Sequence, residues 1–279
     1  VGIYSGYPGK RAGYRILFQL HEGHWKTGYP GRINIGGMIM SLTTVEGLQS
    51  EIFVPLTPKP VFTELKKPLS ECKVAFITAG GIHMKSQTPF NTSGDFSYRT
   101  IPFDTPSDQL MVTHGGFDNS DINKDVNAMF PIDRLHELVE EGFIGSLADE
   151  TYTFMGGGGN VEMFKNKTGP EIAKKLKAQG VDIVLCTGGC GTCHRSATIV
   201  TRCCEEEGMS CVVIAALPPI ARQQGAPRIT APHVPIGSNA GEPNNIPMQT
   251  AIVKESLEWV RDCPSYNGMK VLPYEYRHN

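Results

Sequence analysis

The feature that most constrains the fold is a strand, a loop, a helix and a second strand that follow one another between residues 181 and 216. Residues 181–185 and 211–216 are short apolar runs rich in β-branched side chains, which is typical of strands buried inside a sheet. A glycine-rich loop and a helix near residues 194–207, closed by Gly208, lie between them. Such a βαβ unit has a right-handed crossover, so its two strands are parallel and the predicted fold class is α/β.

Strand and helix signals also alternate in the preceding part of the chain. Residues 73–78 predict a buried strand, and a helix is expected to run from Pro131 to Gly142. A further helix is predicted to begin at Thr168, because residues 168–171 have the capping-box pattern, and to end at Gly180. The expected architecture is a doubly wound, mostly parallel sheet of the Rossmann or flavodoxin-like kind.

Residues 1–39 differ from the rest of the chain. They are rich in glycine and tyrosine, and their basic residues stand against the single acid Glu22. We therefore predict an N-terminal extension or arm at residues 1–39 and an α/β catalytic domain at residues 40–279. The sequence leaves three interpretations of the extension open: a segment removed by processing, an appended segment, or an arm that grips a partner.

Charge and hydrophobicity exclude several classes of protein. A formal net charge of −2 gives no sign of the dense basic surface that nucleic-acid-binding proteins need. No stretch approaches the ~20 consecutive apolar residues of a membrane span, and the N-terminus lacks the apolar core of a signal peptide. We therefore expect a soluble, cytoplasmic protein whose eight cysteines are mostly small buried thiols rather than a disulfide framework.

Three unusual loops stand where predicted strands end. They are residues 79–83, 155–159 and 187–194, and the second contains four consecutive glycines. Because the sites of open α/β sheets lie at the carboxyl ends of the strands, we expect all three loops to surround one cleft. A run of glycines costs conformational entropy on folding, which indicates that the backbone approaches another group closely there.

The third loop carries a dithiol, because its Cys-Gly-Thr-Cys sequence at residues 190–193 places two thiols at the start of a predicted helix. The unpaired N–H groups and partial positive charge of a helix N-terminus favour a thiolate. His194 and Arg195 follow directly and add positive potential. We therefore predict Cys190, Cys193 and His194 as catalytic residues. Cys190, in the loop, is the expected nucleophile, and Cys193, one turn away, is expected to attack it and close a disulfide.

Four segments together form a more specific pattern than the dithiol alone. They read MSLTTVEGL at residues 40–48, VTHGGFDNSDINKD at 112–125, FPIDR at 130–134 and GCGTCHR at 189–195. These segments resemble the selenocysteine-containing subunits of D-proline reductases, a branch of the selenoprotein B family of glycine, sarcosine and betaine reductases. The resemblance extends from about Met40 to about Val260. It departs at the first position of the redox motif, where the family has selenocysteine and this sequence has Cys190.

The resemblance implies an oxidoreductase subunit that reductively cleaves D-proline to 5-aminopentanoate, as in Stickland-type amino-acid fermentation. In the family a partner subunit supplies a pyruvoyl group that activates the substrate nitrogen, and the resemblance implies no cofactor in this chain. Cys190 would attack the substrate α-carbon, and Cys193 would resolve the adduct to a disulfide that an electron-donor redox protein reopens. The implied assembly is a hetero-oligomer. Whether residue 190 is natively cysteine or selenocysteine stays open.

The residues alone also allow other functions. A general thiol-disulfide oxidoreductase would need only the dithiol. The resemblance also allows a related component of a glycine, sarcosine or betaine reductase. A structural zinc module would take its ligands from one short region: Cys186, Cys190, Cys193 and His194.

Two further histidines, His83 and His114, are candidate proton donors. His114 also precedes three aspartates whose spacing invites a metal interpretation: Asp118, Asp121 and Asp125. Acidic residues in a stretch rich in asparagine, aspartate and glycine are more typical of turns and caps, so we expect no metal site.

Overall fold

The computed structural model describes residues 17–21, 32–35, 38–43, 61–157 and 161–277, the first three ranges by their backbone alone. The chain divides into two compact units, Val1–Val54 and Pro55–Asn279. In the first unit, three strands form an antiparallel sheet in the order β1-β3-β2: β1 (Leu17–His21), β2 (Arg32–Ile35) and β3 (Met38–Thr43). The domain boundary predicted at residue 40 stays a prediction.

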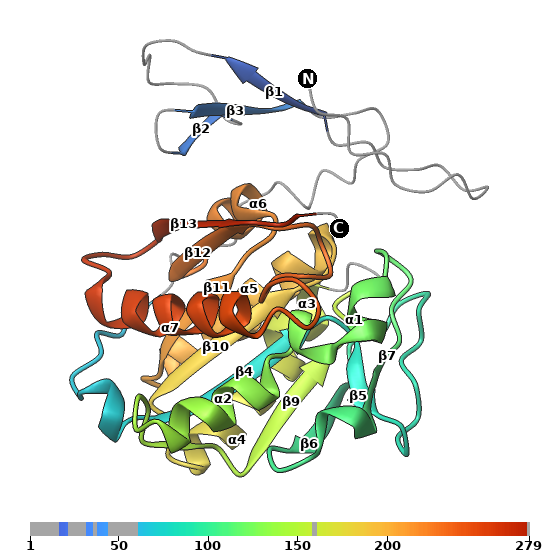
Figure 1. Ribbon diagram of the computed structural model, residues 1–279, viewed down its shortest axis with the longest axis vertical. Coiled ribbons are helices and arrows are strands. Elements are labelled where there is room, and N and C mark those ends of the chain that lie inside the picture. The colour runs from blue at the N-terminus through green and yellow to red at the C-terminus, as the bar shows by residue number, and fades with distance from the viewer. Residues whose placement is uncertain (1–16, 22–31, 36–37, 44–60, 158–160, 278–279) are drawn as a thin grey trace. The chain divides into compact units, whose positions relative to one another are not determined.

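The second unit is built on an eight-stranded sheet in the order β13-β12-β11-β10-β4-β9-β6, with β8 beside β4 (Figure 1). All its pairings are parallel except that of β6 with β9. The strands are β4 (Lys73–Ala79), β6 (Tyr98–Pro102), β8 (Ser146–Leu147), β9 (Glu150–Phe154), β10 (Ile183–Gly188), β11 (Ser210–Ile214), β12 (Arg228–His233) and β13 (Gly268–Glu275). The α/β class with a mostly parallel sheet is therefore confirmed, while the Rossmann or flavodoxin-like label stays a prediction.

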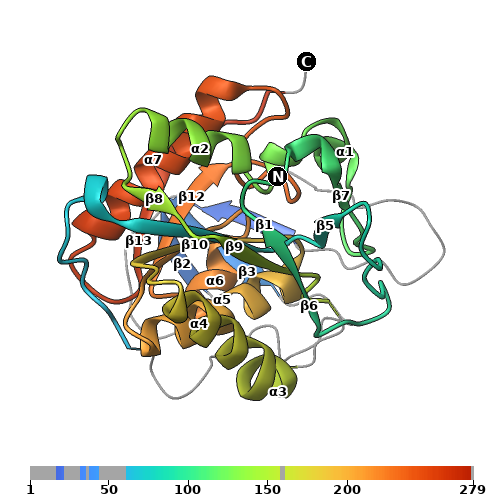
Figure 2. The ribbon, with the colours of Figure 1, turned by 90° about the horizontal axis from the view of Figure 1, so that it is seen from below.

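Helices cover both faces of this sheet. They are α1 (Ser120–Lys124), α2 (Ile132–Glu140), α3 (Val161–Met163), α4 (Gly169–Ala178), α5 (Gly191–Glu206), α6 (Pro218–Gln223) and α7 (Ile246–Asp262). Figure 2 shows α2 and α7 on one face and α4 and α5 on the other. Every residue of β10 is buried, as expected for a parallel strand covered on both sides. A separate antiparallel pair, β5 (Ile82–Met84) with β7 (Leu110–Val112), follows β4.

The predicted βαβ unit is present, but its helix begins earlier than the sequence indicated. α5 starts at Gly191 with Cys190 as its extended N-cap residue, so Cys193 lies inside the first turn. The predicted glycine ends of three helices are confirmed, since Gly142, Gly180 and Gly208 all have left-handed backbone angles.

The capping box predicted at Thr168 is wrong. Thr168 has helical backbone angles, and its hydroxyl donates to the carbonyl of Phe96 instead of capping a helix. The helical chain begins at Val161 and reaches α4 through a π-helical turn, Phe164–Thr168. Pro170 lacks the N–H that an ordinary helical turn would use, and a wider turn in front of it accommodates that loss.

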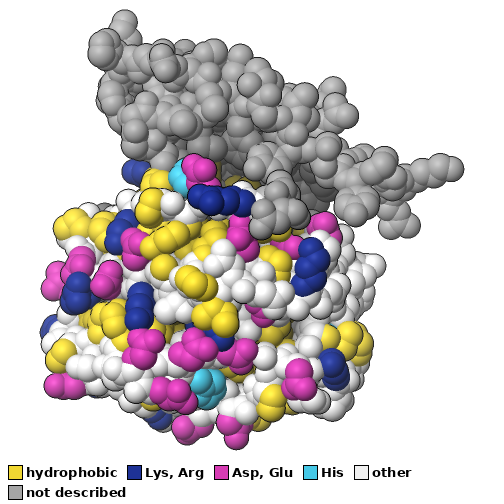
Figure 3. Space-filling view, in the orientation of Figure 1, with side chains coloured by type: hydrophobic (Ala, Val, Ile, Leu, Met, Phe, Trp, Pro, Cys, Tyr) yellow, Lys and Arg dark blue, Asp and Glu magenta, His cyan; other side chains and the backbone are white. Residues whose placement is uncertain are grey.

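Charge on the described surface is mixed in sign. On the face drawn in Figure 3, Lys and Arg side chains lie interspersed with Asp and Glu. This distribution agrees with the small net charge of −2 and offers no broad basic surface on that face. Separately, none of the helices that the structure describes has both the length and the apolar character needed to cross a bilayer.

Candidate active site

The dithiol lies where the central strand β10 ends and α5 begins. Cys190 is half-buried at the N-cap of α5, Cys193 is buried in its first turn, and their sulfurs are 2.9 Å apart. β10 lies between β4 and β11, so the two thiols stand at the carboxyl end of the parallel sheet. The free N–H groups at the start of α5 favour negative charge at this position.

The two thiols have opposite acidities. The pKa of Cys190 is held well below its usual value, chiefly by the hydrogen bond from Cys193, and also by His114 and Thr192, whose combined effect overcomes burial. The pKa of Cys193 is raised well above its usual value by burial and by the hydrogen bond to Cys190 and the charge of Cys190. Cys190 is therefore the more acidic thiol of the pair and the first to ionise, while Cys193 keeps its proton to higher pH.

His114 reaches the dithiol from the loop after β7. Its Nε2 atom lies 2.9 Å from Cys193 Sγ, although the two residues are 79 positions apart, and 2.9 Å from the carbonyl oxygen of Met155. The ring of Phe117 packs on the imidazole with 4.4 Å between the ring centres. The two glycines that follow His114 are the sequence feature that indicates its close contact with the dithiol. A Cβ atom on Gly116 would lie 3.3 Å from Cys190 Sγ and 2.9 Å from His114 Cε1.

Of the three loops predicted to share one cleft, two meet at the dithiol. Gly156 has a left-handed backbone, and a Cβ there would lie 3.0 Å from the Cα of Cys193. The carbonyl of the preceding Met155 accepts from Cys193 Sγ at 3.1 Å. The loop at residues 79–83 packs closely against the segment after β7. A Cβ on Gly81 would lie 2.4 Å from the carbonyl oxygen of Thr113 in that segment. Residues 158–160 lie outside the described residues.

His194 is buried next to the dithiol, and its described hydrogen bonds go to the backbone. Its Nδ1 atom lies 2.8 Å from the carbonyl oxygen of Cys190, and the N–H of Leu217 donates to Nε2 at 3.1 Å. Burial lowers the pKa of His194. This histidine therefore links the Cys190 loop to the segment after β11, and its predicted catalytic role stays a prediction.

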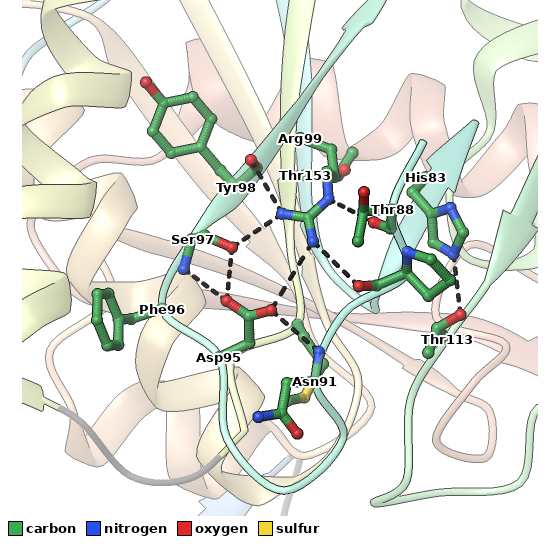
Figure 4. Close-up of polar contacts among 12 residues, drawn as sticks. His83, Thr88, Asn91, Asp95, Phe96, Ser97, Tyr98, Arg99, Thr113 and Thr153 are labelled. Atoms are coloured by element: carbon green, nitrogen blue, oxygen red, sulfur yellow. Dashed lines mark hydrogen bonds and ion pairs between the residues drawn. The ribbon is translucent and has the colours of Figure 1, made fainter. Parts of the chain in front are cut away.

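His83, on β5, has different partners from His114. Figure 4 shows its Nε2 atom facing Thr113, at 2.9 Å from Oγ1. Its Nδ1 atom lies 2.8 Å from the carbonyl oxygen of Met84. Figure 4 also shows the neighbouring turn, in which Asp95 pairs with Arg99. These contacts give His83 a part in holding β5 against β7.

Residues 37–189 match the protein family described as glycine/sarcosine/betaine reductase selenoprotein B (GRDB). The chain belongs to this family. The resemblance inferred from the sequence motifs is therefore confirmed, and so is the predicted class of oxidoreductase component. No solved structure matches the chain significantly.

Individual relatives agree with the family. The chain is 56% identical over 235 residues to D-proline reductase subunit gamma of Acetoanaerobium sticklandii, covering 84% of this chain and 97% of that protein. It is 33% identical over 208 residues to glycine reductase complex component B subunit gamma of Carboxydothermus hydrogenoformans, covering 69% and 47% of the two chains. It is 32% identical over 210 residues to sarcosine reductase complex component B subunit beta of Peptoclostridium acidaminophilum, covering 71% and 48%. The chain thus spans nearly all of the first relative and about half of the other two.

The four residues that the sequence allowed as zinc ligands in this member of the selenoprotein B family do not form one site. Cys186 Sγ contacts the carbonyl of Thr187 within β10, and both ring nitrogens of His194 have backbone partners. Among the described residues, the group whose ligand atoms lie within 4.8 Å of one another is His114, Cys190 and Cys193.

The three aspartates that follow His114 have separate partners. Asp118 accepts from the N–H of Ser120, and Asp121 accepts from the hydroxyls of Ser238 and Tyr276. Asp125 accepts from the N–H and the amide of Asn127 and from the amide of Gln249. The contacts of Asp118 with Ser120 and of Asp125 with Asn127 are the turn and capping contacts expected for such a stretch, whereas Asp121 and Asp125 also accept from side chains far along the chain.

Alkylation at mildly acidic pH is expected to label Cys190 before any other cysteine. A lowered pKa means that Cys190 is already thiolate at a pH where ordinary thiols are protonated. Other cysteines are buried with raised pKa values: Cys72 (to about 11), Cys203 (to about 12), Cys186, Cys193, Cys211 and Cys263. Peptide mapping after brief treatment measures the order. Labelling of Cys203 or Cys263 first would show that the thiolate is assigned to the wrong residue.

Proposed function

We propose that this chain is the catalytic subunit of a D-proline reductase, which cleaves D-proline to 5-aminopentanoate at the expense of a dithiol. The observation that carries the proposal is the pair of sulfurs 2.9 Å apart whose pKa values are shifted in opposite directions. The substrate comes from the identity of 56% to a protein named D-proline reductase subunit gamma. Relatives named as complex components support a hetero-oligomeric assembly.

In the first step the Cys190 thiolate attacks the α-carbon of D-proline. A C–S bond forms, the ring C–N bond breaks, and the electron pair of that bond goes to nitrogen. A pyruvoyl group on a partner subunit would make the nitrogen a better leaving group. The residues of this chain supply the nucleophile, and Gly116 leaves room beside Cys190 Sγ because any side chain there would contact the sulfur.

In the second step Cys193 attacks the sulfur of Cys190. While Cys190 is a thiolate, its charge and its hydrogen bond hold the proton on Cys193. The new C–S bond removes that charge, so Cys193 ionises more easily after the first step than before it. The C–S bond then breaks, its electron pair goes to the α-carbon, which takes a proton, and a Cys190–Cys193 disulfide remains. The order in which the two thiols react thus follows from the effect that the charge on Cys190 has on the pKa of Cys193.

Renewed turnover requires reduction of that disulfide. An electron-donor redox protein would reopen it by thiol exchange, and we place the complex in the cytoplasm because a reducing compartment maintains such donors. If residue 190 is selenocysteine in the natural protein, its selenolate carries out the same step faster, because a selenol is more acidic and a better leaving group than a thiol.

The purified chain alone is expected to be inert toward D-proline, because the substrate nitrogen is then not activated. The measurement is oxidation of a small dithiol that depends on D-proline, with and without a pyruvoyl-containing subunit. Glycine, sarcosine and betaine serve as matched substrate controls. Multiple turnovers by the chain alone would overturn the two-subunit mechanism. Rapid reduction of unrelated protein disulfides without any response to D-proline would favour a general thiol-disulfide oxidoreductase.

A further inference from the structure

The imidazole of His114 is held in one tautomer by the backbone. The N–H of Gly116 donates to His114 Nδ1 at 2.8 Å. A ring nitrogen that accepts a hydrogen bond carries no proton, so the proton of the neutral ring is on Nε2. The Nε2–H group therefore points at Cys193 Sγ and the carbonyl oxygen of Met155, each 2.9 Å away.

Two further contacts keep the ring in this orientation. The side-chain amide of Asn119 donates to the carbonyl oxygen of His114 at 2.8 Å, which anchors the backbone of the loop. Phe117 packs against the imidazole on one side. Turning the ring over would remove Nδ1 from the Gly116 N–H and take the Nε2–H group away from its buried partners, Cys193 Sγ and the Met155 carbonyl oxygen, which is costly.

We propose that His114 is a catalytic residue that acts as a fixed hydrogen-bond donor to Cys193 Sγ while that sulfur becomes a thiolate in the second step. Cys193 is fully buried, so negative charge on its sulfur needs a donor close by. The proton that leaves Cys193 is matched by the proton that the α-carbon takes. His114 therefore neither gains nor loses a proton over the cycle, and its contribution is electrostatic. The inference rests on the proposed function of the dithiol.

This arrangement is unsuited to two other roles. A histidine that binds a metal through Nε2 normally donates from its other ring nitrogen, whereas His114 accepts there from Gly116. Metal binding would therefore require an imidazole with no proton at all. A general base has the same difficulty, because Nε2 already carries its proton and the lone pair of Nδ1 is engaged.

The test measures how fast Cys193 attacks a disulfide on Cys190. It needs neither D-proline nor a partner subunit, so it is independent of the proposed substrate. Ellman's reagent is added to the fully reduced chain. The Cys190 thiolate attacks it, forming a mixed disulfide and releasing one thionitrobenzoate. Cys193 then attacks the sulfur of Cys190, closing the disulfide and releasing a second thionitrobenzoate. The two phases of colour report the two thiols separately, and Cys193→Ser should show the first phase alone.

His114→Ala is expected to slow the second phase on the order of 10- to 100-fold, the usual worth of a hydrogen bond to a charged group. His114→Gln places an amide N–H near the position of Nε2 and cannot act as an acid or base, so it should restore most of that rate. Because His114 also helps to lower the pKa of Cys190, both phases are measured at a pH at which Cys190 is fully ionised in every variant. Under that condition the first phase should change less than the second. His83→Gln is the matched control, since its ring bonds to Thr113 and Met84, and both phases should keep their rates.

Two results would overturn the proposal. If His114→Gln is as slow as His114→Ala, donation of a hydrogen bond is not the role of the residue. If both variants slow the two phases equally, the loss is structural. Nitrogen NMR of the reduced chain supplies a second measurement that does not depend on the variants folding. The His114 ring should show a protonated Nε2 and an unprotonated Nδ1, and the opposite tautomer would contradict the assignment.

Discussion

Cys193→Ser is expected to stop the reconstituted complex after C–N cleavage and to leave the substrate bound covalently to Cys190. A serine hydroxyl cannot attack the sulfur of Cys190 as a thiolate does, so the C–S bond formed in the first step persists. Turnover should fall on the order of 10⁴-fold or more, as for other enzymes that lose an essential nucleophile. The adduct is measured by intact-protein mass spectrometry and located by peptide mapping.

The controls separate the two thiols. Cys190→Ser should be equally inactive but should carry no adduct, because the attacking sulfur is gone. Cys203→Ser alters a buried thiol further along the same helix and should keep its activity. Undiminished turnover of Cys193→Ser, with Cys190 unmodified, would exclude a resolving role for Cys193.

Arg228→Met is expected to lower the free energy of unfolding by about 3–5 kcal/mol, the usual cost of removing one partner of a buried ion pair. Arg228 Nη1 lies 2.7 Å from Glu205 Oε1, and the two side chains are 1% and 0% exposed. Arg228 also lies over the ring of Phe62, with 4.0 Å between the guanidinium carbon and the ring centre. Glu205 accepts from the N–H of Cys211 as well. The pair therefore ties the end of α5 to the starts of β11 and β12.

The loss of stability should grow with pH. Burial raises the pKa of Glu205, and Arg228 opposes that rise. Without the arginine, the pKa of Glu205 in the folded state rises further above its unfolded value. Stability contributed by the protonated carboxyl is present below the unfolded pKa and is lost as pH rises through the folded pKa. The deficit of the variant should thus be smaller at acidic than at neutral pH.

Urea unfolding followed by circular dichroism at both pH values gives the comparison. Arg261→Met is the matched control, because Arg261 pairs with Asp262 on the surface, where the side chains are 50% and 52% exposed. Its effect should stay below about 1 kcal/mol. Equal losses in the two variants, or a deficit for Arg228→Met that shrinks as pH rises, would contradict the role given to the buried pair.

The parts of the structure that local sequence determines were predicted well. The apolar runs of β4, β10 and β11 and the glycines at 142, 180 and 208 depend on neighbours within a few positions. Cys190 and Cys193 also meet for a local reason, since residues three apart at the start of a helix lie on one face. Spacing alone therefore placed the dithiol at the N-terminus of a helix beside a strand end.

Contacts between distant segments needed the tertiary structure. His194 lies next to the dithiol as its place in the chain predicts, but adjacent residues on a helix point in different directions, and its ring nitrogens contact the Cys190 carbonyl and the Leu217 N–H rather than a sulfur. His114 reaches Cys193 from 79 positions away only because the loop after β7 folds over the end of β10. Thr168 begins a capping-box sequence, but its hydroxyl donates to the carbonyl of Phe96 in another segment. The sequence by itself thus determined the strands, the glycine helix ends and the position of the dithiol, because these depend on local backbone preferences. Packing decided which histidine faces the sulfur, because that choice depends on how distant loops meet.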